Sequence, residues 1–340
     1  MGRRFRLVSV EETDISAINP LSTRDWSLSL QQTMKRDMYG FWHSTDKEIK
    51  LDKFCQKKYR YILDEEGPGR STSTEIRCDA YKIVASKHTA GLQTLVLEPF
   101  ETVAEKSPCL VICLGGPFVH IPNVDEQGSI YWHFRQAGFY VVIPLRRGVI
   151  GIKDEWDTCL RGNYGKFDVD DILQGTHDAI DAVSQIDANE VYLYGGSYGG
   201  YDALLIAGKY NATKTFKKII SHCGVFNLAK YPFHCKANPK EVMMEYSDSS
   251  NIESNIEEYI QSISDINPAN YVCNWECPIM IVHTLDDETC WFGQSVEAYN
   301  ECIKHKKEAK LILLPGPHTY EVENKEALFN FFLKFYSKKF

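Results

Sequence analysis

A glycine-flanked serine follows an apolar run near the middle of the chain. The run Val191 to Tyr194 leads into a G-x-S-x-G pattern centred on Ser197, and a helix-like segment, Asp202 to Ala207, follows. A serine at a strand-to-helix turn has a strained backbone, which close-packed glycines permit. Its hydroxyl projects at the helix N-terminus, where backbone N–H groups favour a developing negative charge. The pattern predicts a nucleophile and therefore a hydrolase.

A serine hydroxyl needs a base and a third group that orients the base. His318 follows the apolar run 311–314 and precedes the last predicted helix, which distinguishes it among ten histidines. Asp286 and Asp287 follow the run 279–283, so the chain order is serine, acid, histidine, as in α/β-hydrolases. Neighbouring side chains point in different directions, so one of the two aspartates should reach His318. All three groups follow strands and can meet at one edge of a parallel sheet.

Two backbone N–H groups are expected to form an oxyanion hole. One belongs to Tyr198, directly after the serine, and the other to Gly116 in the glycine pair that follows the apolar run 110–114. Glycine lets main-chain N–H groups approach a substrate oxygen closely. The sequence thus predicts the complete apparatus for acyl transfer.

These groups require a sheet to position them, and short apolar runs alternate with helix-length segments from about residue 76 onward. The predicted strands are 76–85, 94–97, 110–114, 140–143, 191–194, 219–222, 279–283 and 310–314, and the predicted helices are 128–137, 168–186, 199–210, 293–304 and 325–336. This alternation indicates a mostly parallel sheet flanked by helices on both faces. The predicted class is α/β, in an α/β-hydrolase fold.

The first 70 residues have a different pattern. A helix is predicted from Thr23 through Trp42, and the breaker-rich stretch 65–73 is a natural boundary. We therefore expect a helical N-terminal appendage or cap over residues 1–70 and a catalytic domain over 71–340.

Composition narrows the class of partner and compartment. The chain has 340 residues, 44% apolar content and a net charge of −8, which disfavours nucleic acid because phosphate binding requires a dense basic surface. Eleven cysteines without a C-x-x-C pair suit a reducing cytoplasm, and no apolar run is long enough for a signal peptide or membrane span. No metal or organic cofactor is expected.

From about residue 75 onward the chain resembles the catalytic domain of the prolyl oligopeptidase family of serine peptidases. The matching segments are Leu114-Gly115-Gly116-Pro117, 144–151, Asp168-Val169-Asp170-Asp171, 195–201 and 281–287. The resemblance implies that Asp287, four residues past His283, is the acid. It also implies a pocket for the residue before the scissile bond near Tyr198, Val225, Leu228, Tyr231 and Cys290.

The sequence departs from the family pattern at two places in these motifs and in its domain content. Leu114 stands where the family has histidine, and Thr284 where it has glycine. The family's β-propeller, which restricts access to short peptides, has no counterpart in this sequence. The fold and the triad are expected to survive, whereas peptide specificity is left open.

The leading hypothesis is a serine hydrolase that acts on peptide or amide substrates through an acyl-enzyme. An esterase, thioesterase or C–C bond hydrolase with an N-terminal cap is the first alternative, because the same triad serves many carbonyl substrates. A catalytically silent binding protein is the second. The expected ligand is a small molecule or short peptide, and the oligomeric state is left open, a homodimer included.

Overall fold

A computed structural model of the chain describes the backbone of residues 4–12, 34–36, 42–44, 59–66, 74–77, 81–101, 104–122, 124, 128–156, 159–210, 214–247, 256–318 and 325–337. Side chains are described from residue 81 onward within these ranges, except at 154 and 325–327. All structural statements below concern these residues.

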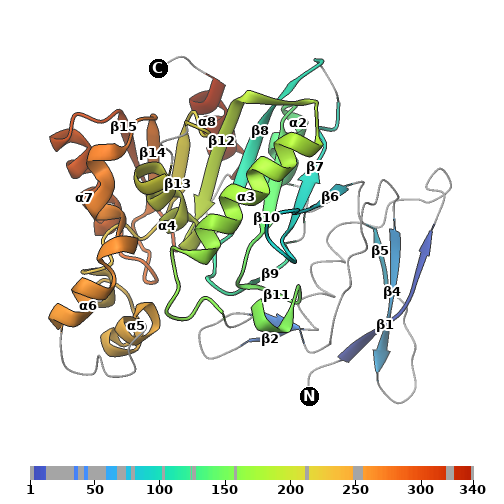
Figure 1. Cartoon of the computed structure of the whole chain (residues 1–340), viewed down its shortest axis with the longest axis horizontal. Coiled ribbons are helices and arrows are strands. Elements are labelled where there is room, and N and C mark those ends of the chain that lie inside the picture. The colour runs from blue at the N-terminus through green and yellow to red at the C-terminus, as the bar shows by residue number, and fades with distance from the viewer. Residues whose placement is uncertain are drawn as a thin grey trace.

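An eight-stranded sheet forms the centre of the molecule (Figure 1). Its order is β15-β14-β13-β12-β8-β10-β7-β6. The strands are β6 (Tyr81–Ala85), β7 (Gln93–Leu97), β8 (Ser107–Cys113), β10 (Tyr140–Leu145), β12 (Ile186–Gly196), β13 (Ile219–His222), β14 (Ile279–Thr284) and β15 (Ala309–Leu314). Only β7 among them runs antiparallel to its neighbours, β10 and β6. The mostly parallel sheet and the α/β-hydrolase fold predicted from the sequence are confirmed.

Helices cover both faces of this sheet, which explains why β10 and β14 are buried along their whole length. One face carries α3 (Phe167–Ala182), α4 (Tyr198–Leu205) and α7 (Gly293–Lys304), whose buried side chains join one core cluster. The other carries α2 (Ile130–Gln136) and α8 (Lys325–Ser337), whose phenylalanines join a second cluster (Figure 1). The five predicted helices are present, although α3 ends at Ala182 and Ile186 already begins β12.

Two short helices in the segment between β13 and β14 were not predicted. They are α5 (Pro239–Tyr246) and α6 (Ile256–Ser262). The Asn238 side chain caps α5 by accepting from the Lys240 N–H at 3.0 Å, and Pro239 occupies the first turn. Only Val242 and Tyr246 of α5 are buried, so its apolar stripe is too short to stand out in the sequence.

The described part of residues 1–70 consists of strands, so the predicted helical character is wrong there. β1 (Arg4–Glu12) and β4 (Tyr59–Glu66) pair antiparallel, and β5 (Thr74–Arg77) extends this sheet across the expected boundary at residue 70. The helix expected over 23–42 is replaced at its end by a hairpin of β2 (Met34–Arg36) and β3 (Trp42–Ser44).

In the sequence, Gly40 stands between these two strands, and a glycine in a helix interior costs about 1 kcal/mol relative to alanine. Residues 23–33 and 37–41 of the expected helix lie outside the described residues. The described helices include none with the length and apolar content that crossing a bilayer requires.

Candidate active site

Ser197 occupies a sharp turn between β12 and α4, with φ 57° and ψ −123°. Its N–H donates to the carbonyl oxygen of His222 at 2.8 Å, which ties the turn to the end of β13. A Cβ on Gly195 would lie 1.9 Å from the Gly199 oxygen, and one on Gly199 would lie 2.1 Å from the Cys113 oxygen. Both glycines are therefore required by close backbone approach, as the sequence pattern indicates.

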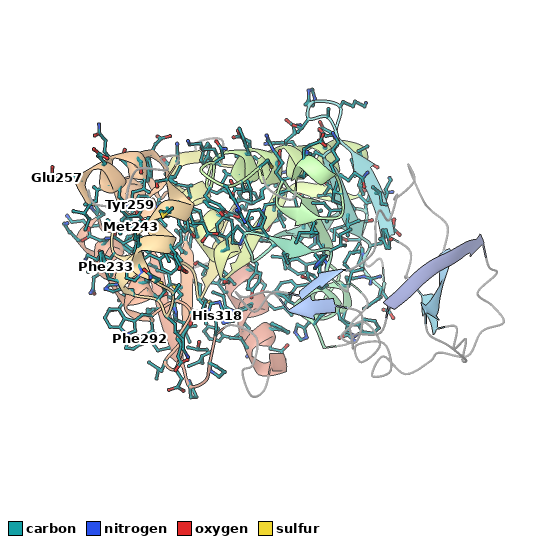
Figure 2. All side chains as sticks on the ribbon, turned by 90° about the horizontal axis from the view of Figure 1, so that it is seen from below. Phe233, Met243, Glu257, Tyr259, Phe292 and His318 are labelled. Atoms are coloured by element: carbon teal, nitrogen blue, oxygen red, sulfur yellow. The ribbon has the colours of Figure 1, made fainter. Side chains whose placement is uncertain are left out.

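The structure brings together Ser197, His318 and Asp287. His318 Nε2 lies 2.8 Å from Ser197 Oγ, and His318 Nδ1 lies 2.6 Å from Asp287 Oδ2. His318 follows β15, and its side chain is 22% exposed, whereas the Asp287 side chain is fully buried. Figure 2 labels His318 in a view from below, and the strands β12, β14 and β15 all end on this side of the sheet (Figure 1). The spacing lets one imidazole accept a proton from the serine while its other nitrogen donates to the carboxylate.

The Asp287 carboxylate has partners on both oxygens. Oδ1 accepts from the backbone N–H groups of Thr289 and Cys290 at 2.9 and 2.8 Å. Oδ2 faces His283 Nε2 at 3.1 Å in addition to His318. Burial by itself raises the pKa of Asp287, but hydrogen bonds from His283 and His318 outweigh it and hold that pKa well below its ordinary value. The group is thus a carboxylate at neutral pH.

Asp286 turns away from His318 and contacts the loop that carries it. The Asp286 N–H donates to the Gly316 oxygen at 3.0 Å, and Asp286 Oδ2 accepts from the Gly316 N–H at 3.1 Å. This reciprocal pair joins the two loops that follow β14 and β15. Asp286 therefore holds the loop of His318 in place from outside the hydrogen-bonded trio.

The Gly115–Gly116 backbone lies beside the serine. A Cβ on Gly115 would lie 3.3 Å from the Gly196 oxygen and 3.7 Å from the Ser197 Cβ. Gly116 has φ 129°, and a Cβ there would lie 2.8 Å from the Phe118 nitrogen. Glycine is required at Gly116, whereas a Cβ on Gly115 would be tight but not excluded, and this loop lies beside Ser197.

Arg146 holds that loop, a role that the sequence reasoning did not find. Its guanidinium is fully buried and donates to the carbonyl oxygens of Leu114 (3.1 Å), Gly115 (3.0 Å) and Pro117 (3.0 Å). With these oxygens turned toward the arginine, the peptide planes of the loop are fixed. The motif 144–151 contains the signal, but the partner carbonyls are about 30 residues away in sequence.

Two buried aspartates accompany Arg146 beneath the serine. Asp202 Oδ2 lies 3.7 Å from Arg146 Nε. Burial and the neighbouring Asp168 raise the pKa of Asp202 well above its ordinary value. Asp168 accepts from the Gly165 and Val169 N–H groups at 3.2 and 3.0 Å and from the Tyr198 hydroxyl. Asp168 lies in the acidic first turn of α3, where it complements the helix dipole. It also has a second role, because its carboxylate holds the side chain of Tyr198, the residue after the serine.

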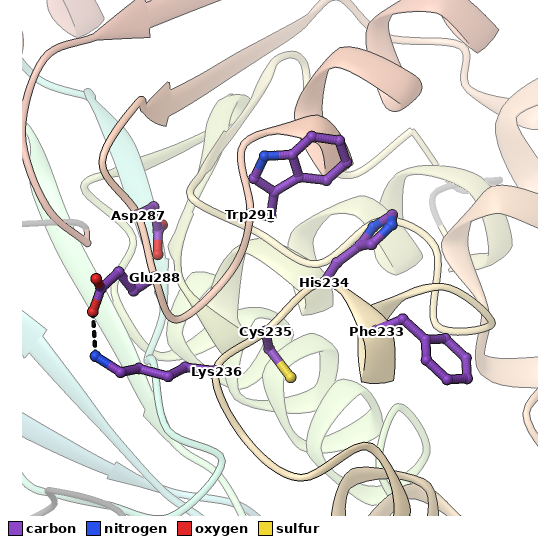
Figure 3. Close-up of a pocket in the computed structure, with 7 residues that line it drawn as sticks. All are labelled: Phe233, His234, Cys235, Lys236, Asp287, Glu288 and Trp291. Atoms are coloured by element: carbon purple, nitrogen blue, oxygen red, sulfur yellow. Dashed lines mark hydrogen bonds and ion pairs between the residues drawn. The ribbon is translucent and has the colours of Figure 1, made fainter.

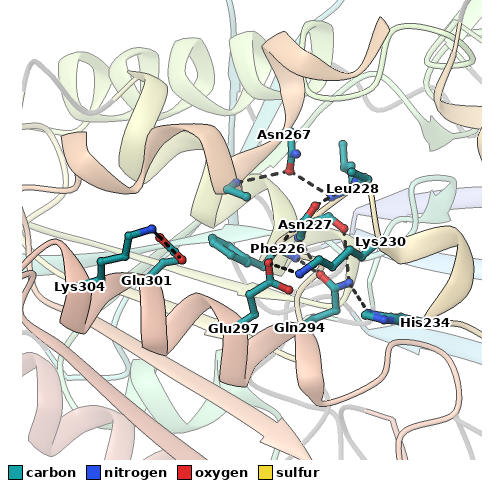
Figure 4. A network of polar contacts seen from close by, with 12 residues as sticks. Phe226, Asn227, Leu228, Lys230, His234, Asn267, Gln294, Glu297, Glu301 and Lys304 are labelled. Atoms are coloured by element: carbon teal, nitrogen blue, oxygen red, sulfur yellow. Dashed lines mark hydrogen bonds and ion pairs between the residues drawn. The ribbon is translucent and has the colours of Figure 1, made fainter. Parts of the chain in front are cut away.

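The residues expected to line a substrate pocket lie in two neighbouring loops. Val225, Leu228 and Cys290 are buried, and Tyr231 is half-buried with its ring 6.1 Å from that of Tyr246. The loop after β13 is held by Gln294 of α7, whose Oε1 accepts from the Phe226 and Asn227 N–H groups at 3.0 and 2.7 Å (Figure 4). Asn267 Oδ1 accepts from the Leu228 N–H at 3.1 Å (Figure 4).

An aromatic cluster joins this region to the serine, and the sequence reasoning missed half of it. The Tyr164 ring lies 5.8 Å from that of Tyr198, 4.9 Å from that of Tyr246, and 6.4 Å from that of Phe118 in the loop after β8. The Tyr164 hydroxyl donates to Glu245 at 2.9 Å. Tyr164 and Tyr246 come from the loop before α3 and from α5, an element that the apolar pattern did not indicate.

An open pocket of about 530 Å³ adjoins Asp287 (Figure 3). Its walls are the two loops after β13 and β14, and the residues that line it are Phe233, His234, Cys235, Lys236, Asp287, Glu288 and Trp291. Phe233 and Trp291 are 55% and 45% exposed, so the walls present aromatic surface to solvent. Asp287 borders this pocket, although its carboxylate is covered.

Residues 127–340 match the model of the prolyl oligopeptidase family. The chain belongs to the prolyl oligopeptidase family. It is 25% identical over 335 residues to dipeptidyl-peptidase 5 of Porphyromonas gingivalis, covering 92% of this chain and 48% of that protein. It is 27% identical over 214 residues to the acylamino-acid-releasing enzyme of Rattus norvegicus, covering 61% of this chain and 28% of that protein.

Solved structures of the family share the fold. Acylaminoacyl peptidase of Pyrococcus horikoshii superposes with a TM-score of 0.65 at 19% identity, covering 84% of this chain and 49% of that one. An acylaminoacyl peptidase in complex with Z-Gly-Gly-Phe-chloromethyl ketone gives a TM-score of 0.66 at 19% identity over 88% and 50% of the two chains. The chain thus spans half or less of the length of these prolyl oligopeptidase relatives.

Proposed function

We propose that this chain is a serine peptidase or amidase in which Ser197 attacks the scissile carbonyl of a peptide-like substrate. The observation that carries the proposal is the continuous hydrogen-bonded path from Asp287 through His318 to Ser197, at 2.6 and 2.8 Å. Membership of the prolyl oligopeptidase family favours peptide substrates over other carbonyl compounds.

The mechanism follows from the positions of these three groups. His318 Nε2 takes the proton of Ser197 Oγ as the oxygen attacks the carbonyl carbon, and Asp287 stabilises the resulting imidazolium. His318 then gives that proton to the leaving amine, which leaves an acyl group on Ser197. Water deprotonated by His318 attacks the acyl group and releases the acid.

The oxyanion of each tetrahedral intermediate is proposed to accept from the backbone N–H groups of Gly116 and Tyr198. Support comes from the loop 115–116 beside Ser197 and from the helix N-terminus at Tyr198. Such donors act without rearrangement because Arg146 and Asp168 hold their surroundings in place.

The side chain before the scissile bond is proposed to lie against Tyr198, Val225, Leu228, Tyr231 and Cys290. Support for this comes from their position in the loops around the serine and from the aromatic cluster behind them. The tyrosine-rich surroundings favour an apolar side chain. A catalytic unit over 71–340 with an N-terminal appendage is also part of the proposal. So is a cytoplasmic location, which is supported by the nine described cysteines, none of which is in a disulfide.

Paired substrates test the proposal. Amide and ester derivatives of one acyl group, including a free-amine dipeptide amide and an N-blocked one, are compared with Ser197→Ala as control. Amide turnover that Ser197→Ala abolishes supports a peptidase, and the preference between free and blocked amines separates dipeptidyl from acylaminoacyl release. Turnover of esters alone would assign the esterase alternative, which the same triad would also serve.

A further inference from the structure

Three side chains of metal-ligand type gather at Asp287, next to its contact with His318. Cys223, His283 and Asp287 are buried, and each offers a ligand atom within 4.8 Å of the other two. All three lie at the C-terminal edge of the sheet. Cys223 directly follows β13, His283 lies at the end of β14, and Asp287 lies in the loop after β14. Two of them take no direct part in the proposed chemistry.

We propose that Cys223, His283 and Asp287 form a binding site for Zn²⁺ that switches off the serine centre by withdrawing Asp287 from His318. Zinc is bound in proteins by thiolate, imidazole and carboxylate ligands, and this site offers one of each. The inhibition rests on the proposed function, because it requires that the serine centre hydrolyses a substrate. Zinc binding itself does not depend on that function.

The distances suit a small tetrahedral ion. With zinc bonds of about 2.0–2.3 Å, neighbouring ligand atoms lie about 3.4–3.6 Å apart. His283 Nε2 and Asp287 Oδ2 are already 3.1 Å apart. All three ligand atoms lie within 4.8 Å of one another, so the thiol has to approach the other two by at most about 1.4 Å to reach the tetrahedral value.

The backbone at Cys223 supports this placement. Cys223 has φ 51°, a conformation that costs a side-chain-bearing residue of order 1–3 kcal/mol. Its N–H donates to the Val282 oxygen at 2.8 Å, and its Sγ lies 3.4 Å from Thr284 Oγ1. These contacts with β14 hold the thiol beside the end of the strand that carries His283.

Ser295 of α7 supplies the outer partner that a metal-bound histidine requires. Its Oγ lies 2.6 Å from His283 Nδ1. In the metal-free chain Nε2 carries the imidazole proton, because it faces two acceptors, the Cys290 oxygen and Asp287 Oδ2. Zinc binding moves that proton to Nδ1, which then donates to Ser295. Nε2 then presents its lone pair to the ion and gives up its present contact with the Cys290 oxygen, at 2.7 Å. Zinc replaces the proton of the Cys223 thiol, which passes to solvent, so one proton leaves for each ion bound.

The open pocket beside Asp287 gives the ion a route and a fourth ligand. Asp287 and Cys235 line this pocket (Figure 3), whereas Cys223 and His283 are fully buried, so the ion has to enter past Asp287 and bring a water as its fourth ligand. Once zinc binds Asp287 Oδ2, the imidazole of His318 loses the carboxylate that orients it and stabilises its cation. Hydrolysis should therefore fall while the fold persists.

The test uses the whole chain, with Co²⁺ as a spectroscopic probe and Zn²⁺ as the inhibitor. One equivalent of Co²⁺ should produce a thiolate-to-cobalt charge-transfer band in the near ultraviolet, and Zn²⁺ should abolish both this band and hydrolysis, reversibly on addition of a chelator. Cys223→Ser should remove the band, retain hydrolysis and weaken inhibition by roughly 100-fold or more, and Ser295→Ala should weaken it roughly 10- to 100-fold.

Cys235→Ser is the matched control, since its thiol lines the same pocket, and it should leave the band and the inhibition unchanged. If Cys223→Ser destabilises the chain, Cys223→Ala replaces it in the cobalt titration. A band that survives in the Cys223 variants, disappears in Cys235→Ser or never forms would overturn the site. Metal-free hydrolysis is recorded separately, so failure of the proposed function is seen independently of metal binding.

Discussion

Asp286 and Asp287 are consecutive residues with separate tasks. Asp287 Oδ2 lies 2.6 Å from His318 Nδ1, whereas Asp286 Oδ2 accepts from the Gly316 N–H at 3.1 Å. One carboxylate orients the imidazole, and the other secures the loop on which that imidazole stands. The two can therefore be separated by experiment.

Asp287→Asn should lower kcat roughly 10³- to 10⁴-fold, because the amide favours the wrong imidazole tautomer and cannot stabilise the imidazolium. Asp286→Asn should cost less than about tenfold, since the backbone pair with Gly316 remains. Steady-state kinetics on one amide substrate decides between them. The reverse ranking would move the acid to Asp286.

Arg146→Lys should lower kcat/KM roughly 100-fold, because one ammonium cannot replace guanidinium bonds to the carbonyls of Leu114, Gly115 and Pro117 and the oxyanion loop shifts. Arg147→Lys is the matched control. Arg147 pairs with buried Asp171 at 2.7 Å and contacts none of these three carbonyls, so its loss should lower stability but not kcat/KM of the folded fraction. Equal kinetic losses in both variants would contradict the role of Arg146.

Gly199→Ala should prevent folding or destabilise the chain by more than about 4 kcal/mol, because the new Cβ would lie 2.1 Å from the Cys113 oxygen. Gly138→Ala provides the comparison. Gly138 has φ 86° but nothing within 4 Å of a new Cβ, so its cost should be limited to about 1–2 kcal/mol of backbone strain. Urea unfolding measures both, and similar losses would show that crowding is not what demands glycine at the turn.

Buried His222 should make stability depend on pH. Burial lowers the pKa of His222 from 6.5 to about 3, with smaller contributions from His283 and His318. Between these two pKa values His222 stays neutral in the folded state but is protonated in the unfolded state. Its contribution to the free energy of unfolding is therefore complete above pH 6.5 and is lost as the pH falls toward 3. The free energy of unfolding should fall by about 1.4 kcal/mol per pH unit from this group between pH 6 and 4.5.

His222→Gln should reduce the slope of the free energy of unfolding against pH by the amount that corresponds to about one proton. The glutamine amide can still contact the Tyr194 hydroxyl, which lies 3.0 Å from His222 Nδ1. Denaturant titrations at several pH values provide the measurement. An unchanged slope in His222→Gln would mean that other groups account for the pH dependence.

Much of this arrangement could be predicted from local pattern. Seven of the eight predicted strands coincide with strands of the central sheet, whereas the predicted strand 76–85 is divided between β5 and β6, which belong to different sheets. Ser197, Asp287 and His318 each follow one of the seven. The parallel sheet then brings their loops to one edge without any knowledge of long-range contacts. The preference for Asp287 over Asp286 came from the family motif, and the hydrogen bond to His318 agrees with it.

The parts that escaped prediction depend on contacts between distant segments. In the sequence, Arg146 stands just after the predicted strand 140–143, and nothing nearby indicates its contacts. Its role becomes clear only from its hydrogen bonds to carbonyl oxygens in 114–117. Tyr164 and Tyr246 meet across 82 positions of sequence, through a short helix with little periodicity. Within the apolar pattern that predicted a helix, residues 34–36 and 42–44 pair as strands, so strand pairing outweighed local propensity there.

Labelling with a fluorophosphonate tests the central claim most directly, because the reagent reports an activated serine whatever the natural substrate is. The account predicts one adduct per chain, located by peptide mass spectrometry at Ser197, absent in Ser197→Ala and formed at least about 10³-fold more slowly in His318→Ala. Absence of an adduct on the folded protein, or labelling that persists in Ser197→Ala, would contradict it.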